Sequence, residues 1–148
     1  MVTGPIANSG LQAPVGLAGA GPLCAIGREA SPHRDQERSL WLHQAVAGRL
    51  VADPEPVLER ATANLRKLRE VHSDGAVTRS WEEWEQVLAR GPIRVLEALT
   101  SREPWARELR QNTPFAGVLT AEERTAVLDA FRRHWRRSRA ALRRSTCS

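Results

Sequence analysis

Side chains that could carry acid–base, nucleophilic or metal chemistry are few in this chain and stand far apart. None of the four histidines has a CxxC, HxxxH or HExxH partner, so no zinc-binding pattern is present. They are His33, His43, His72 and His134. Cys24 and Cys147 lie near the two ends, where no packed shell is expected to lower the pKa of a thiol. We therefore predict a noncatalytic protein, not an enzyme, with no catalytic residue, no metal and no cofactor.

The remaining candidates for catalysis have simpler structural interpretations. His43 falls inside a helical pattern, and we expect it at the helix surface or boundary rather than in the role of a base. Glu82, Glu83 and Glu85 cluster at the expected start of a helix, where the helix dipole favours negative charge. The glycines form no phosphate-binding loop, because they fall in the N-terminal segment or at expected helix ends.

Chemistry directed at nucleic acid is better represented. The stretch from Trp81 to Asn112 is predicted to form three helices, of which the third, Glu103 to Asn112, follows a turn short enough for a helix-turn-helix. It presents side chains that are able to read base edges in a major groove, namely Arg107, Arg110, Gln111 and Asn112. Glu103 and Glu108 on the same helix would repel phosphate, so an ordinary solvated helix is the competing interpretation.

A second basic element lies at the C-terminus. The net charge of the chain is +5, and residues 121–148 hold 8 Arg against only 3 acidic residues, so this region carries the whole imbalance. Seven of the arginines are candidates for phosphate contacts: Arg132, Arg133, Arg136, Arg137, Arg139, Arg143 and Arg144. Like charges four residues apart destabilise a free helix, and an anionic partner would remove that penalty. The competing interpretation is a solvated terminus.

The elements that must position these residues are helical. The chain has 148 residues, 41% of them hydrophobic, which suits one domain with a real core and excludes a membrane-spanning protein or a disulfide scaffold. Residues 1–35 hold most of the glycines and no apolar periodicity, and we predict that they are disordered. A secretion signal and a start codon placed too far upstream are the alternatives for this segment.

From Gln36 onward, apolar residues recur at helical spacing. We expect a first helix over about 36–51 and a second that Asp53 caps and Ser73-Asp74-Gly75 ends. A capping box of Ser80 and Glu83 is expected to open the third helix, and Gly91-Pro92 to close it and start the fourth.

Two further helices complete the pattern. Ser101 is expected to open a short helix that stops before Pro114. A second capping box, Thr120 with Glu123, precedes a last helix over about 121–143, whose part beyond Trp135 should project into solvent. The sequence thus predicts an all-α fold: a compact bundle of five or six short helices over 36–136, a long basic C-terminal helix with an extension at 137–148, and the disordered N-terminal segment.

Two aromatic residues are candidates for partner binding. Trp81, Trp84, Trp105 and Trp135 fall at core positions of their helices, whereas Trp41 lies one residue away from the apolar face of the first helix. Trp41 either flanks the core or anchors a partner, since Trp is enriched at the centres of interfaces. Phe115 lies in an apolar turn, where it either plugs the bundle or contacts a partner.

Two stretches of the sequence carry a family resemblance. Arg110-Gln111-Asn112-Thr113-Pro114-Phe115-Ala116-Gly117-Val118-Leu119 and Ser39-Leu40-Trp41-Leu42-His43-Gln44-Ala45-Val46-Ala47 resemble small all-helical actinobacterial proteins that form the antitoxin or regulatory half of toxin–antitoxin pairs. The resemblance covers about residues 35–131 and neither end. It implies a cytoplasmic, noncatalytic protein that neutralises a cognate toxin protein, with its own promoter as a further expected target. The alternative function is a small helix-turn-helix-like transcriptional regulator that binds duplex DNA.

Overall fold

Prolines mark the points at which most of the helices begin. The computed structural model describes residues 31–72 and 75–147, and four of its helices start with a proline. The fixed φ of proline suits the first helical turn, where the missing N–H is not needed. The helices are α1 (Pro32–Ala52), α2 (Pro54–Val71), α3 (Ala76–Ala89), α4 (Pro92–Thr100), α5 (Pro104–Gln111) and α6 (Ala121–Thr146). The prediction of an all-α fold is confirmed, since no strand forms within the described ranges.

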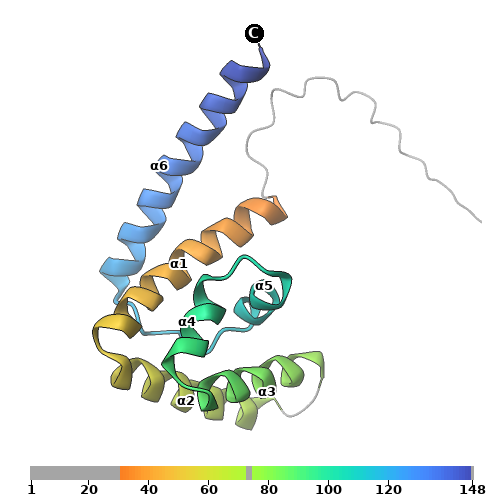
Figure 1. The fold of residues 1–148 in the computed structure, drawn as a ribbon, viewed down its shortest axis with the longest axis vertical. Helices are drawn as coiled ribbons and strands as arrows, with labels where there is room; N and C mark the ends of the chain where they lie inside the picture. The colour runs from red at the N-terminus through yellow and green to blue at the C-terminus, as the bar shows by residue number, and fades with distance from the viewer. Residues whose placement is uncertain (1–30, 73–74, 148) are drawn as a thin grey trace, which may run out of the picture. The chain divides into compact units, whose positions relative to one another are not determined.

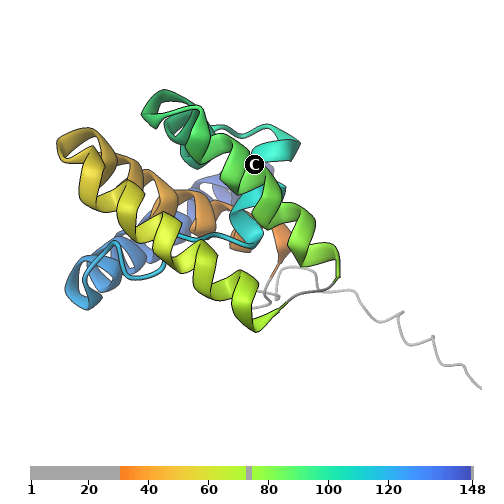
Figure 2. The same cartoon turned by 90° about the horizontal axis from the view of Figure 1, so that it is seen from below.

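Helix α1 is the centre of the helical unit that begins at Pro32. It packs against α2, α4, α5 and α6, while α3 packs against α2, α4 and α5 (Figure 1). Seen from below, α2 and α3 lie side by side (Figure 2). The core therefore sits between α1 on one side and the α2–α5 helices on the other.

The core is organised around Trp84, which is fully buried. Its indole Nε1–H donates a 2.9 Å hydrogen bond to the carbonyl of Leu109, so the one polar atom of the ring is satisfied. The Phe115 ring meets it edge to face at a centroid distance of 5.3 Å. Trp81 is buried as predicted, whereas Trp105 is half-buried and lies 4.4 Å from the guanidinium carbon of Arg94.

Helix α6 packs mainly on α1 through a separate cluster of aromatic rings. Phe131 is its only buried residue, and the Trp41 ring from α1 lies 5.7 Å from it and 5.1 Å from His134. Trp135 stacks obliquely on Phe131 at 5.7 Å and on His33 at 5.6 Å. Beyond this cluster the side chains at 136, 137 and 141–147 are exposed, as expected for the projecting end (Figure 1).

The start of α6 is fixed as the sequence predicts. Thr120 Oγ1 accepts a 3.1 Å hydrogen bond from the Glu123 backbone N–H, and Glu123 accepts one of 2.8 Å from the Thr120 backbone N–H. The Glu123 carboxylate also pairs with Arg49 of α1. These bonds lower the pKa of Glu123, first through the Thr120 backbone and then through Arg49. The capping box therefore also joins α6 to α1.

Four predicted boundaries are wrong. α1 begins at Pro32, so residues 32–35, assigned to the disordered segment, are its first turn. Ser80 lies inside α3 and opens no helix, because Gly75, with φ +109°, precedes the first helical turn at residue 76. The start of α2 is predicted correctly, since Asp53 precedes it, but the Asp53 side chain makes no capping hydrogen bond.

The other two differences lie at α5 and α6. α5 starts at residue 104 rather than at Ser101, whose hydroxyl accepts a 3.1 Å bond from the Glu103 N–H. α6 continues to Thr146, past the expected end at 143 and through the extension set apart at 137–148. The rest of the prediction of N-terminal disorder, over residues 1–30, falls outside the described residues.

Candidate functional site

A cavity of about 310 Å³ lies between α1 and the turn that joins α5 to α6. Residues from both stretches that carry the family resemblance line it, which brings segments 39–47 and 110–119 to one place. Its polar lining comprises Asp35, Arg38, Ser39, His43, Arg110, Thr113 and Arg124, and its larger apolar side chains are Leu42, Val46, Phe115 and Leu119. We take this cavity as the candidate functional site because it joins apolar walls to several cationic groups.

The turn that forms one wall is held in place by α2. The Asn64 Nδ2 amide donates 2.8 Å hydrogen bonds to the carbonyls of both Pro114 and Ala116. Arg60 Nη2 donates to the Gly117 carbonyl at 3.3 Å. Gly117 has φ +81°, a conformation that residues with a side chain rarely adopt, and its α-carbon faces the Arg60 guanidinium. The turn is therefore a fixed wall, set by side chains distant in sequence.

His43 is buried at the back of the cavity, with 5% of its surface exposed, so the expectation of a surface or boundary position is wrong. Its Nδ1 lies 2.7 Å from the Ser39 carbonyl, a separation at which Nδ1 must carry the proton and donate. The pKa of His43 is lowered to about 4, chiefly by burial and also by the charge of Arg110, against the raising effect of the Ser39 bond. The imidazole is therefore neutral at neutral pH.

This burial predicts a specific loss of stability in acid. The unfolded chain protonates His43 near its ordinary pKa of 6.5, while the folded chain resists protonation until about pH 4. As the pH falls through that window, the unfolded state binds more protons, and the free energy of unfolding should fall by roughly 3 kcal/mol. Urea titrations of the parent and of His43→Gln, taken between pH 7 and pH 4, measure the difference.

The exposed histidine His72 provides the matched control. His72→Gln should leave the pH dependence of the parent intact, because folding does not bury the His72 side chain. Equal pH dependence in the parent and His43→Gln would contradict the assignment of a neutral buried imidazole.

Arg110 is not available to read bases, which corrects its place in the predicted recognition helix. Its side chain is 4% exposed, and Nη1 donates a 2.9 Å hydrogen bond to the Ala98 carbonyl of α4. Ala106 and Leu109 are buried on the same face of α5, so Arg110 shares the side of the helix that packs inward. Its guanidinium lines the cavity instead.

Two further recognition residues are held by intramolecular hydrogen bonds. Arg107 is exposed, but its Nε donates to the Arg102 carbonyl at 3.1 Å and its Nη1 to Gln36 Oε1 at 3.2 Å. Asn112 Nδ2 donates to the Ser80 hydroxyl at 3.3 Å. Of the four, Gln111 alone is exposed with no side-chain hydrogen bond among the described residues. The four side chains thus form no common reading surface, and the base-reading assignment of α5 is not supported.

The two partner-binding candidates are also engaged within the chain. Phe115 is 4% exposed and belongs to the core. Its ring therefore fills the bundle, as one of the two interpretations expects, and is unavailable to a partner. Trp41 is half-buried against Phe131 and His134, where it joins α6 to α1. Only the remaining exposed part of the Trp41 side chain is left for a partner.

The C-terminal arginines lie along α6. Arg133, Arg136, Arg137 and Arg143 are exposed, and so are Arg132 and Arg144. Arg132 Nη1 donates a 2.6 Å bond to Asp129, three residues earlier, whereas Arg139 is half-buried. Within the described residues, Arg133, Arg136, Arg137 and Arg143 are exposed and form no ion pair, so their charge is available along the second half of α6.

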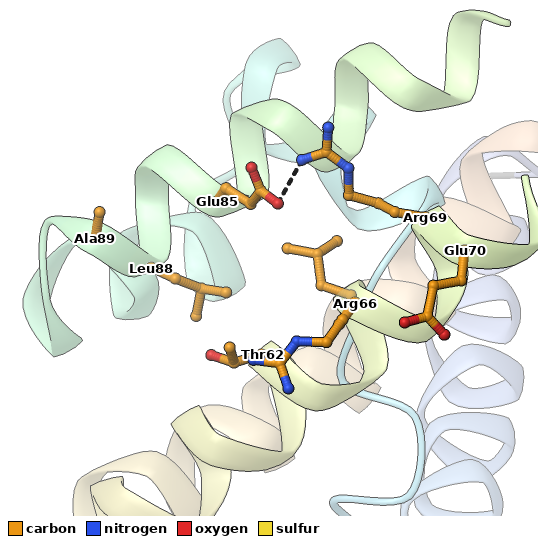
Figure 3. A pocket seen from close by; sticks show the side chains of 8 residues that line it. Thr62, Arg66, Arg69, Glu70, Glu85, Leu88 and Ala89 are labelled. Atoms are coloured by element: carbon orange, nitrogen blue, oxygen red, sulfur yellow. Dashed lines mark hydrogen bonds and ion pairs between the residues drawn. The ribbon is translucent and has the colours of Figure 1, made fainter. Parts of the chain in front are cut away.

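A second cavity, of about 640 Å³, is a groove between α2 and α3 that sequence reasoning did not identify. Leu65 and Leu88 contribute apolar surface to it, and an ion pair between Arg69 and Glu85 crosses it, which raises the pKa of Arg69 (Figure 3). None of the predicted site residues lines this groove. Substitutions in this groove, for example at Arg66, can therefore serve as controls for substitutions at the candidate site.

Comparisons with family models, curated proteins and solved structures find no match to this chain. Within the described residues no group of three or more His, Cys, Asp or Glu side chains is placed to hold a metal ion. Each described helix is also too short or too polar to cross a membrane.

Proposed function

We propose that this chain is a cytoplasmic, noncatalytic, antitoxin-like protein that binds and neutralises a partner toxin enzyme. The observation that carries the proposal is the meeting of segments 39–47 and 110–119 at one cavity, because these two stretches carry the resemblance to antitoxin-like proteins. The two segments meet only in the folded bundle, and such a preformed surface suits a binding role better than a disordered segment does.

Charge around the cavity defines the partner surface further. Arg38 and Arg124 line the cavity and are exposed, and among the described residues only Arg38 of the two forms an ion pair, with Asp35 at 3.6 Å. An acidic patch on the partner would complement these arginines and speed association. We therefore assign the partner contact to the mouth of the cavity, with the exposed part of Trp41 as a separate contact on α1.

The test is a rescue experiment. The proposal expects the product of a neighbouring gene to arrest growth when expressed alone, and co-expression of this chain to restore growth. The double variant Arg38→Glu, Arg124→Glu should weaken the complex by about 10-fold or more, because it places like charges against the acidic patch. Isothermal titration of the purified pair measures the loss.

The matched control reverses two cations away from the cavity. Arg66→Glu combined with Lys67→Glu makes the same change in net charge on the exposed side of α2 and should leave the affinity within about twofold. Equal weakening by the two double variants would mean that only net charge matters. A neighbouring gene product that arrests nothing and binds nothing would reject the proposed function.

A second candidate function, binding to the DNA backbone, is favoured by the exposed arginines of α6. Six of these arginines, Arg132, Arg133, Arg136, Arg137, Arg143 and Arg144, are exposed along the second half of α6. Because α5 lacks a common reading surface, this role would position the protein on phosphates without selecting a sequence. For the chain to regulate its own promoter in this way, the partner or another element would have to supply the sequence specificity.

A further inference from the structure

A buried guanidinium without a carboxylate partner stands at the inner wall of the cavity. Arg110 makes one hydrogen bond, to the Ala98 carbonyl, which uses one of its five N–H donors. Among the described residues no acidic side chain lies within ion-pair distance of it. The two nearby carboxylates are already paired, Asp35 with Arg38 and Glu37 with Arg102. Buried charges in proteins are normally paired, so the unpaired guanidinium marks this wall as a candidate site for an anion.

The electrostatic surroundings of Arg110 favour an anion. Burial lowers the pKa of its guanidinium, and the positive charges of Arg107 and Arg102 lower it further, while Glu37 acts in the opposite direction. Arg124 from α6 also lines the cavity, and the neutral His43 adds no charge there. The site therefore holds more positive than negative charge, and a bound anion would relieve the repulsion.

The free donors of Arg110 are accessible through cavities rather than sealed in the core. Its side chain lines the cavity of about 310 Å³ and also two adjoining cavities of about 380 and 180 Å³. The apolar lining of the cavity of about 310 Å³ comes from Leu42, Val46, Phe115 and Leu119. The space suits a short hydrocarbon stem and is too small for a docked helix.

We propose that this cavity binds a carboxylate carried on a short apolar stem, with Arg110 as the residue that receives the carboxylate. A guanidinium presents two parallel N–H donors that match the two carboxylate oxygens. The stem would lie against the apolar wall. Inorganic phosphate fits less well, since it would place no apolar group against that wall. The proposal holds for the isolated chain and does not depend on whether the partner is a toxin.

The test follows the Arg110 Nε–Hε resonance by NMR in the full-length protein while hexanoate is added. Saturable movement of this resonance is expected, with hexanamide binding about 10-fold or more weaker because it lacks the charge. Acetate, which lacks the stem, and inorganic phosphate should also bind more weakly. Equal binding of hexanoate and hexanamide would overturn the proposal, as would equal binding of phosphate or an unmoved Arg110 resonance.

A second set of ligands distinguishes a free carboxylic acid from a protein carboxylate as the natural ligand. A capped pentapeptide with a central glutamate, and its glutamine counterpart, test whether a protein side chain can reach the site that hexanoate reaches. Movement of the Arg110 resonance by the glutamate peptide identifies a protein carboxylate as an acceptable source, and movement by hexanoate alone identifies a free acid. Movement by neither rejects the site.

Substitutions check that the ligand sits at Arg110. Arg110→Met should reduce hexanoate affinity by about 10-fold or more, and the control Arg66→Met, in the α2–α3 groove, should leave it unchanged. Unchanged affinity in Arg110→Met would overturn the proposal. Where Arg110→Met fails to fold, the resonance of the parent protein still decides, because that measurement needs no variant.

Discussion

Replacing Phe115 with alanine should lower the free energy of unfolding by about 3–5 kcal/mol, the cost typical of removing a fully buried phenyl ring. The Phe115 side chain is 4% exposed, and its ring contacts the Trp84 indole edge to face at the centre of the core. The surrounding wall cannot collapse easily into the space, because Asn64 fixes the turn on both sides of Phe115. A loss of this size is a large part of a typical total stability of about 5–15 kcal/mol.

Urea unfolding followed by circular dichroism measures the loss. Ile93→Ala is the matched control, since that side chain is 72% exposed and its removal should change stability by less than about 0.5 kcal/mol. A Phe115→Ala variant as stable as the parent would contradict the assignment of this ring to the core. If such a variant also lost its partner, Phe115 would be a binding residue, as the sequence alone allowed.

Local sequence signals identified the helices because each signal acts within a few residues. Gly91 adopts φ +100° directly before Pro92, and this pair separates α3 from α4 as expected. The Thr120–Glu123 box opens α6 through two hydrogen bonds between residues three apart. Apolar spacing identified Trp81 and Trp84 as core residues for the same reason, since helical periodicity alone places them on one face.

The same local reasoning failed where two signals competed. Ser80 and Glu83 have the spacing of a capping box, but the chain already turns at Gly75, and α3 starts one residue later. Ser80 then lies inside the helix and accepts a hydrogen bond from Asn112. Asn112 is 32 residues away, so no local pattern contains this contact.

The candidate site depended still more on contacts between distant segments. Arg110 and His43 are polar residues whose helices bury them, and a sequence pattern assigns polar side chains to the solvent. One signal was available: Ala106 and Arg110 stand four apart on α5, with Leu109 beside them, so the apolar face of this short helix includes position 110. The wall formed by residues 113–119 had no such signal, because Arg60 and Asn64 of α2 hold it from outside.

Duplex DNA binding by α6 should depend steeply on salt. We expect five of the seven arginines between 132 and 144 to contact phosphates. At about −0.9 for each contact, the slope of log K against log salt is then about −4.5. Raising salt about fourfold, from 50 to 200 mM, should then weaken binding by about 500-fold. Fluorescence anisotropy with a labelled duplex measures the slope, and unrelated duplexes should give similar affinities because α5 offers no reading surface.

Neutral substitutions on α6 separate this role from a general effect of net charge. Changing four exposed arginines, Arg133, Arg136, Arg137 and Arg143, to glutamine leaves the Trp135 contact with α1 in place. Because one to three of the five contacts then remain, the slope should flatten to between about −0.9 and −2.7. The control changes the exposed Arg66, Lys67, Arg79 and Arg90 to glutamine and should keep the slope near that of the parent. Equal flattening in both variants would place the contacts outside α6. No binding by the parent even at 50 mM salt would reject the DNA role and leave the α6 arginines to an acidic protein surface or to solvent.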